Sequence, residues 1–382
     1  MKIAFIHNQK KIGTGAHYIN DLMALKLRQH KIETKNFYPK TELIDSPSHL
    51  KGLANILFFY SLLDHKKEIL KYSIIQGTTY TPLPFLALSI PVISHFGSTT
   101  SGFLKSVPLA NNIEKSTKFV WYSLRKNGVI KELNIKTRRP IRDIAEVEYY
   151  VASKATAVIA TSENVKKELI LKGVPEEKIK IIHNAIEDYW FAKPISLPLS
   201  NPQLVFLGRL GSDVFTLKLK GIDRLIHFYK KFPKIKKTTV CMTHNKALKN
   251  WLKKEVPNHT VFTNFKKDLI PNVLRPLAGS ILFIPSRYEG FSLSLIEGMS
   301  QGLIPIIYPV GVAPEIIKNG VNGFIVKNQK EAIEKTKKIL SDERLRRDMC
   351  LEALDTAREF RSEVMANKLY DFYHKILHKK KI

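Results

Sequence analysis

Short apolar runs alternate with amphipathic helical patterns along most of the chain, and no other feature of the sequence restricts the fold as strongly. In the first half each apolar run reads as a buried strand. Buried strands joined by helices are typical of a parallel sheet covered on both faces. The expected strands are Lys2–His7, Ser73–Gln76, Val92–His95, Ala157–Ala160 and Lys180–His183, and the expected helices are Tyr18–Gln29 and Glu163–Lys172.

The alternation restarts after Phe191–Gln203, a segment with three prolines that is the best linker candidate in the chain. The expected strands of this second series are Leu204–Leu207, Thr238–Met242, Ile281–Ile284 and Ile304–Ile307, and the expected helices are Ile222–Phe232, Leu293–Gln301 and Ser362–Leu377. A chain of 382 residues suggests two domains of ordinary size. We therefore expect a first domain over residues 1–190, a linker over 191–203, a second domain over 204–360, and a terminal helix over 361–382 that packs back on the first domain.

The formal net charge of +28 is the strongest compositional signal. It is compatible with nucleic acid, an anionic membrane or anionic small molecules as partners, and equally with a lysine-rich proteome. Two distant cysteines give neither a disulfide framework nor a zinc site. The first residues read as a buried strand rather than a signal peptide, and the longest apolar runs are too short or too proline-rich to span a bilayer. We expect a cytoplasmic protein.

Glycines follow the first expected strand, at Gly13 and Gly15, just before a helix. Such a turn lets a ligand approach the backbone, and the helix N-terminus favours an anion. A simple tight turn explains the same residues. The full dinucleotide fingerprint is not met because Tyr18 occupies its last position, so the signal for NAD is weak.

Cations surround a second glycine turn, which follows the strand Leu204–Leu207. Arg209 comes directly after this strand, and Lys218 and Lys220 precede the next helix. Cations beside a glycine turn and a helix N-terminus suit a diphosphate. Solvated surface charges are the alternative, which is more plausible for Lys218 than for Arg209.

Two carboxylates lie eight positions apart in "SRYEGFSLSLIEGMSQGLIPII". Glu289 precedes a glycine, and Glu297 is the only charged residue between Gly290 and Pro309. We expect a helix to begin near Ser292, with both carboxylates facing one site where they accept hydrogen bonds from vicinal hydroxyls. A buried ion pair is the alternative for Glu297. A glycosidase pair is a further alternative, although such acids usually come from separate elements.

Metal and P-loop signatures are absent from the sequence. There is no Asp-x-Asp, no His/Cys/acid cluster with ligand spacing and no GxxxxGK[ST]. A bound divalent metal and a P-loop are therefore not expected.

Several longer segments resemble glycosyltransferase family 4, the group 1 retaining transferases. The matching residues are "GRL…LKGIDRLI", "LFIPSRYEGFSLSLIEGMSQGLIPII" with its Glu-x7-Glu spacing, "GVAPEIIKNGVNGFIV", "VIATSENVKKELILKGVPEEKIKIIHNAIE" and "FRSEVMANKLYDFY". The resemblance covers most of residues 150–377 and is thinner over 1–150, where the glycine loop and "SHFGS" fit. It implies the GT-B fold, an α/β architecture with two Rossmann-like, doubly wound parallel-sheet domains facing a central cleft.

The resemblance also implies an activity: a retaining, metal-independent hexosyltransferase that uses a nucleotide sugar, here a UDP-sugar. The acceptor would be a glycan or a lipid-linked glycan in surface polysaccharide, lipopolysaccharide or teichoic-acid assembly. No cofactor is expected. Retention without an obvious nucleophile suggests attack from the face of the leaving group, with the leaving phosphate taking the acceptor's proton.

Residue roles are implied in the same way. Arg209 and Lys220 would bind the donor diphosphate, Glu297 the ribose and Glu289 the sugar. The expected neighbours of the donor are Gly290, Phe291, Ser292 and Leu293 around Glu289, with Gly13, Gly15 and His95 from the first domain. The chain departs from the family in a longer loop between Arg209 and Lys220, which makes Lys218 a possible substitute, and in the missing double glycine of the first loop.

Residues 115–142 hold nine Lys/Arg and one acid, Glu132, with Phe119, Trp121 and Tyr122 among them. Basic residues mixed with aromatic rings suit an anionic membrane surface, whereas a solvated basic loop is the alternative. Two other functions stay open at this point: a nucleotide-sugar 2-epimerase of the same fold, and a basic nucleic-acid-binding protein, although no nucleic-acid-binding motif occurs. We expect no nucleic-acid partner.

Overall fold

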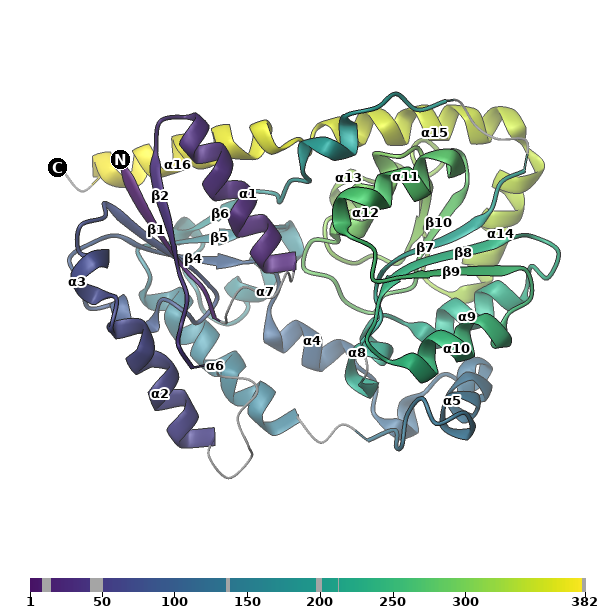
Figure 1. The fold of residues 1–382 in the computed structure, drawn as a ribbon, viewed down its shortest axis with the longest axis horizontal. Coiled ribbons are helices and arrows are strands. Elements are labelled where there is room, and N and C mark those ends of the chain that lie inside the picture. Colours follow the sequence, from purple (N-terminus) through teal and green to yellow (C-terminus); the bar gives the residue numbers. More distant parts are fainter. Residues whose placement is uncertain (9–14, 42–50, 135–137, 197–200, 212, 380–382) are drawn as a thin grey trace. The chain divides into compact units, whose positions relative to one another are not determined.

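The computed structural model describes residues 1–8, 15–41, 51–134, 138–196, 201–211 and 213–379 (Figure 1). The chain forms two compact units, each assembled from separate stretches of sequence. The first unit comprises Met1–Ser101, Pro140–Glu187 and Phe360–Ile382, and the second comprises Gly102–Arg139 and Asp188–Glu359.

The first unit is built on a six-stranded parallel sheet with the order β2-β1-β3-β4-β5-β6. Its strands are β1 (Lys2–Ile6), β2 (Glu33–Phe37), β3 (Ile74–Thr78), β4 (Val92–Phe96), β5 (Ala157–Ala160) and β6 (Ile179–Ile181). Its helices are α1 (Gly15–Gln29), α2 (Lys51–Leu63), α3 (Lys66–Ile69), α6 (Arg138–Lys154), α7 (Glu163–Ile170) and α16 (Ser362–Lys379). Both β4 and β5 are buried along their whole length, because helices cover both faces of the sheet.

The terminal helix α16 packs on the first unit, beside α1 (Figure 1). Its buried Tyr373 donates a hydrogen bond of 2.8 Å to Gln76 Oε1 in β3, and Leu369 is fully buried. At the start of the helix, Glu363 bonds His30, which follows α1, at 2.9 Å. Leu369 and Tyr373 thus place apolar and aromatic side chains of α16 in the core of the first unit.

The second unit holds another six-stranded parallel sheet, in the order β12-β11-β10-β7-β8-β9. Its strands are β7 (Leu204–Arg209), β8 (Lys237–Met242), β9 (His259–Thr263), β10 (Ile281–Ile284), β11 (Ile304–Ile307) and β12 (Phe324–Ile325). Its helices are α5 (Lys118–Lys126), α8 (Val214–Leu219), α9 (Ile222–Lys230), α10 (Lys246–Glu255), α11 (Ile270–Leu274), α12 (Leu293–Met299), α13 (Ala313–Ile316), α14 (Gln329–Ser341) and α15 (Glu343–Arg358), while α4 (Thr100–Ser106) joins the two units in sequence. The predicted class, two doubly wound parallel sheets, is confirmed.

The division of the chain differs from the expected first domain over 1–190, because Gly102–Arg139 belongs to the second unit. Buried polar contacts hold this segment there. Lys218, which is fully buried, donates hydrogen bonds to the carbonyl oxygens of Pro108 (2.9 Å) and Leu133 (3.0 Å). Thr117 donates to the buried Asp223 at 2.9 Å. These partners come from distant parts of the sequence, so the strand and helix pattern alone does not reveal them.

In the described part of the chain, no helix is both long enough and apolar enough to cross a membrane.

Candidate functional site

The second sheet has its topological switch point between β7 and β10. From β7 the chain moves outward to β8 and β9, and it then returns to β10 on the opposite side of β7. Ligands of open α/β sheets bind beyond the carboxyl ends of the strands at such a point. Arg209 is the last residue of β7, and the loop that carries Glu289 follows β10. The predicted cation and carboxylate therefore leave the sheet from its two switch-point strands.

Arg209 is exposed at this edge, although it follows four buried residues of β7. No hydrogen bond or ion pair joins its guanidinium to another residue that the structure describes. A guanidinium offers five N–H donors in a planar fork that matches phosphate oxygens. Arg209 is therefore available to an anionic ligand without breaking an internal pair.

Lys220 and Glu289 form the centre of the site. Lys220 Nζ lies 2.6 Å from Glu289 Oε1, and the Ser286 hydroxyl donates to the same oxygen at 2.7 Å. The side chains of Lys220 and Glu289 are 22% and 14% exposed, so the pair lies near the surface but is largely shielded from solvent. Both groups keep unused hydrogen-bonding capacity, since an ammonium has three donors and a carboxylate about four acceptor positions.

Gly221 brings the Lys220 turn against the loop after β10. Its φ of 64° lies in the left-handed region that glycine adopts without strain. A Cβ at this position would lie 2.2 Å from the carbonyl oxygen of Pro285, so another residue would push the two segments apart. The backbone of Arg287 also donates to the carbonyl of Leu219 at 2.8 Å. Lys220 and Glu289 thus meet because both of their backbones are fixed.

Lys218 is directed away from the pair that Lys220 forms with Glu289. The long loop that the sequence suggests between Arg209 and Lys220 contains the short helix α8, capped by Asp213, whose Oδ1 accepts from Thr216 N at 2.8 Å. Two positions along a helix differ by roughly 200° in direction, and Lys218 is accordingly buried toward Pro108 and Leu133. Helix α8 thus separates a structural lysine from one at the site.

The turn between Glu289 and α12 is strained. Ser292 has φ 81° and ψ 71°, a left-handed conformation that is uncommon outside glycine. Its hydroxyl is buried and finds no hydrogen-bond partner among the described residues. Gly311 supports the turn closely, since a Cβ there would lie 2.4 Å from Phe291 O. Strain of this kind, held by neighbouring backbone, is common where a ligand binds.

Glu297 lies in α12 and is 7% exposed. Its Oε1 is 3.2 Å from Lys267 Nζ, so the ion pair kept as an alternative for this residue is present. No sequence pattern marks Lys267, because one lysine among the many of this chain carries no signal. The ammonium of Lys267 offsets the charge of the Glu297 carboxylate at low exposure, and a carboxylate accepts hydrogen bonds from hydroxyls.

His95 lies near the end of β4 in the first unit, where Thr78 of β3 is its register partner. Both His95 Nε2 and Thr78 Oγ1 are buried and have no hydrogen-bond partner in the described part of the chain. Burial lowers the pKa of His95 to about 4, so the ring is neutral at physiological pH. No pattern singled out Thr78. Gly15 begins α1, and Gly13 lies outside the described residues.

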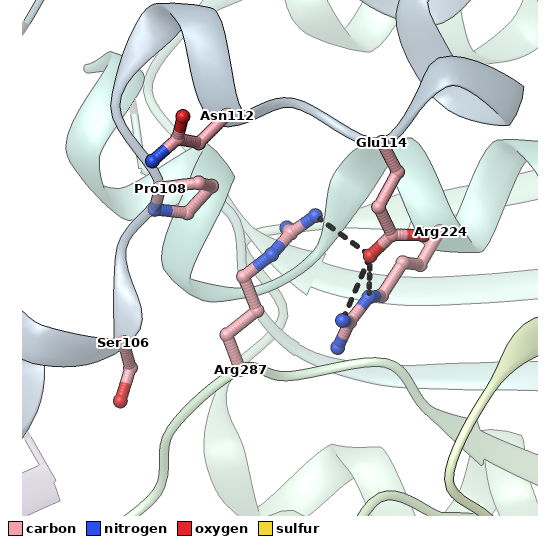
Figure 2. Close-up of a pocket in the computed structure, with 6 residues that line it drawn as sticks. All are labelled: Ser106, Pro108, Asn112, Glu114, Arg224 and Arg287. Atoms are coloured by element: carbon pink, nitrogen blue, oxygen red, sulfur yellow. Dashed lines mark hydrogen bonds and ion pairs between the residues drawn. The ribbon is translucent and has the colours of Figure 1, made fainter.

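The second unit contains a pocket of about 300 Å³. One of its lining residues, Arg287, lies two positions before Glu289 in the sequence. Figure 2 shows Glu114 directed toward the guanidinium groups of Arg224 and Arg287. Arg287 also makes a bidentate contact with Asp223, at 2.8 and 2.7 Å. Burial would raise the pKa of Asp223, but the hydrogen bonds and charge of Arg287 hold it below its usual value. The remaining lining residues are Ser106, Pro108 and Asn112.

Gly102 and Phe103, just before these lining residues in the sequence, pack against the loop that joins β10 to α12. Phe103 packs edge-on against Tyr288, with ring centroids 5.0 Å apart, and a Cβ at Gly102 would lie 2.3 Å from the Tyr288 ring. Arg287 is therefore held by Asp223 and Glu114, and Tyr288 is held by Phe103. These two residues come just before Glu289 in the sequence. Residues 102–117 thus help to position the carboxylate at the switch point.

Two family models match this chain. The model described as "Glycosyltransferase Family 4" matches residues 29–188, and the one described as "Glycosyl transferases group 1" matches residues 192–353. The chain belongs to the group 1, family 4 glycosyltransferases.

Curated relatives agree with this. An uncharacterized glycosyltransferase of Methanocaldococcus jannaschii is 26% identical over 220 residues, which is 52% of this chain and 54% of the relative. An Escherichia coli protein named UDP-Gal:alpha-D-GlcNAc-diphosphoundecaprenol alpha-1,3-galactosyltransferase is 27% identical over 195 residues, which is 46% of this chain and 48% of that protein. The matches to these two proteins thus extend over about half of their length.

Solved structures share the fold over nearly the whole chain. A sucrose-phosphate synthase from Thermosynechococcus elongatus has a TM-score of 0.73 at 15% identity, covering 99% of this chain and 100% of the other. Anabaena HepE in complex with UDP has a TM-score of 0.65 at 18% identity, with 98% and 100% covered. At these identities the likeness establishes the GT-B fold alone.

Proposed function

We propose that the protein is a retaining glycosyltransferase that moves a hexosyl group from a UDP-sugar to a glycan or lipid-linked acceptor. The observation that carries this proposal is the Lys220–Glu289 pair at the switch point, with Arg209 at the end of the switch-point strand β7. It offers two cations for a diphosphate beside a carboxylate for sugar hydroxyls. The choice of UDP follows two similar proteins: the HepE structure contains UDP, and the E. coli relative is named for UDP-Gal.

The proposed binding mode uses the hydrogen-bonding capacity left at the site. The donor's diphosphate approaches Arg209 and shares Lys220 with Glu289. Glu289 accepts hydrogen bonds from the transferred sugar and is held in place by Ser286. Glu297, fixed by Lys267, accepts from the two ribose hydroxyls.

The proposed reaction breaks the bond between the sugar's anomeric carbon and the diphosphate oxygen. The acceptor hydroxyl bonds to the same carbon on the same face, and its proton moves to the departing phosphate oxygen. Negative charge grows on the diphosphate during this step. Arg209 and Lys220 stabilise that charge where it develops, which is the most effective place for a fixed cation. We propose that these side chains make a divalent metal unnecessary.

The proposed acceptor is anchored at a membrane, as in surface polysaccharide, lipopolysaccharide or teichoic-acid assembly. The E. coli relative's name contains such an acceptor, a diphosphoundecaprenol-linked sugar. Residues 115–142 would contribute charge, because their cations Lys115, Lys118, Arg125, Lys126 and Lys131 are exposed. One aromatic residue of that expectation needs correction. Trp121 is 2% exposed and belongs to the core of the second unit, whereas Phe119 and Tyr122 are 40% and 70% exposed.

The test is protection against thermal unfolding by a panel of UDP-, GDP- and ADP-sugars. We expect a UDP-sugar to raise the unfolding temperature most. Glu297→Ala should weaken that donor by about 10- to 100-fold, since hydrogen bonds to a charged group are worth about 1.5–3 kcal/mol. Glu352→Ala, which removes an exposed carboxylate from α15, is the matched control. Normal donor binding by Glu297→Ala would show that the ribose assignment is wrong. Conversion of the donor to an epimer without any acceptor would favour a 2-epimerase.

A further inference from the structure

Helix α2 in the first unit is apolar on its exposed side as well as its buried side. Phe58 and Leu62 are fully buried in the core of the unit. On the other side Ile56 is 66% exposed and Tyr60 is 65% exposed. A helix that covers a core on one face ordinarily presents polar residues on the opposite face. Packing within the unit therefore does not explain the composition of α2.

The exposed apolar side chains form one stripe. Ile56, Tyr60 and Leu63 follow the i, i+4, i+7 spacing that places residues on one face of a helix, and Leu57 lies beside them, 44% exposed. Leu70, just after α3, is 47% exposed. Figure 1 shows α2 and α3 in succession along the flank of the first sheet. Single exposed apolar residues are common, whereas a contiguous group signals an interaction surface.

Cations border this stripe at its C-terminal end. Lys66, Lys67 and Lys71 are exposed, and no hydrogen bond or ion pair links any of their ammonium groups to another described residue. The nearby acids are already neutralised within the unit: Asp64 pairs with Lys40 at 2.7 Å, and Glu68 pairs with Lys35. The border of the apolar stripe therefore carries net positive charge.

We propose that this face, formed by Ile56, Leu57, Tyr60 and Leu63 with Lys66, Lys67 and Lys71, docks on the surface of an anionic lipid bilayer. Apolar side chains on one helix face enter the boundary between headgroups and acyl chains, and the adjacent lysines meet anionic headgroups. Tyrosine suits this boundary because its ring is apolar and its hydroxyl stays hydrated. The charge of the border favours an anionic bilayer over a second copy of this chain, whose net charge is +28 and whose own border would repel it.

Docking would hold the protein at the surface where the proposed acceptor is anchored, and in that respect the inference rests on the proposed function. The binding itself needs neither donor nor acceptor. Co-sedimentation with vesicles of phosphatidylcholine, with and without phosphatidylglycerol, measures it directly. We expect binding to the anionic vesicles that falls as salt is added, because salt screens the lysines.

Two pairs of variants test the face. The double variant Ile56→Ser/Tyr60→Ser should lower partitioning to anionic vesicles at least tenfold, whereas Leu171→Ser, which removes an apolar residue 81% exposed elsewhere on the unit, should leave it unchanged. Lys66→Glu/Lys67→Glu should have a similar effect, and Lys167→Glu/Lys180→Glu a much smaller one. Thermal protection by the donor, unchanged in all four variants, shows that each is folded and separates this test from the proposed transfer activity.

Three vesicle results would overturn the inference: equal binding to neutral and anionic vesicles, no binding to either, or binding that survives both changes in α2 and α3. A lipid-free dimer that Ile56→Ser/Tyr60→Ser dissociates would also overturn it, and would identify the stripe as an interface between two copies.

Discussion

Lys218 and Lys220 lie two positions apart, and replacing each with methionine should produce opposite phenotypes. Lys218→Met removes two hydrogen bonds from a buried ammonium and leaves the carbonyls of Pro108 and Leu133 without those donors. Hydrogen bonds to charged groups are worth about 1.5–3 kcal/mol each, and relief from burying the ammonium offsets part of that loss. We expect the second unit to lose about 2–4 kcal/mol of its free energy of unfolding.

Lys220→Met should change stability little, because Ser286 still donates to Glu289 and the pair is partly hydrated. Transfer should instead fall by about 10²- to 10³-fold, the usual effect of removing one fixed group that stabilises developing charge. Urea unfolding followed by tryptophan fluorescence measures the first effect, and initial rates with a UDP-sugar measure the second. Similar losses of transfer from both variants, with both still folded, would refute the assignment of Lys218 to structure and Lys220 to the donor.

Three further expectations follow from the site and its surroundings. Arg209→Ala should reduce turnover by about 10²-fold with little loss of stability, because its exposed side chain has no partner in the described part of the chain; normal turnover would remove it from the site. Activity should survive EDTA, and a loss that Mg²⁺ or Mn²⁺ restores would contradict a metal-free reaction. Burial raises the pKa of Glu148 from 4.5 to about 7, so the folded state binds this proton more tightly and the carboxyl's contribution to stability declines as pH rises through that range. Glu148→Gln should remove that part of the pH dependence of the unfolding free energy measured by urea titration. A variant profile identical to that of the unmodified protein would show that the pKa of Glu148 is not raised in the folded state.

The central strands were predictable because their signal is local. The expected strands Ala157–Ala160, Ile281–Ile284 and Ile304–Ile307 match β5, β10 and β11 residue for residue. Each is a continuous apolar run, since helices cover both faces of its sheet. The edge strands β2 and β9 were missed because half-exposed positions interrupt their apolar pattern.

The site was predictable to the extent that it follows the strands. Arg209 and Glu289 end or follow buried strands, so topology alone brings them to one edge. Lys267 and Thr78 could not be found in this way. Lys267 is distinguished by its ion pair with Glu297, and Thr78 by a buried hydroxyl without a hydrogen-bond partner among the described residues, and both features depend on the tertiary structure. The different fates of Lys218 and Lys220 likewise depend on α8, a helix too short to show a period in the sequence.

Inclusion of Gly102–Arg139 in the second unit has a consequence for hybrid enzymes. The chain passes between the units at four points, after residues 101, 139, 187 and 359. A chimaera joined at the linker over 191–203 would take residues 102–139 from one parent and residues 204–359 from the other. The buried hydrogen bonds between these two segments would then be lost. Lys218 would lose its hydrogen bonds to the carbonyls of Pro108 and Leu133, and Asp223 would lose the hydrogen bond that Thr117 donates. The second unit is therefore a discontinuous module, and residues 102–139 must be transplanted together with residues 188–359.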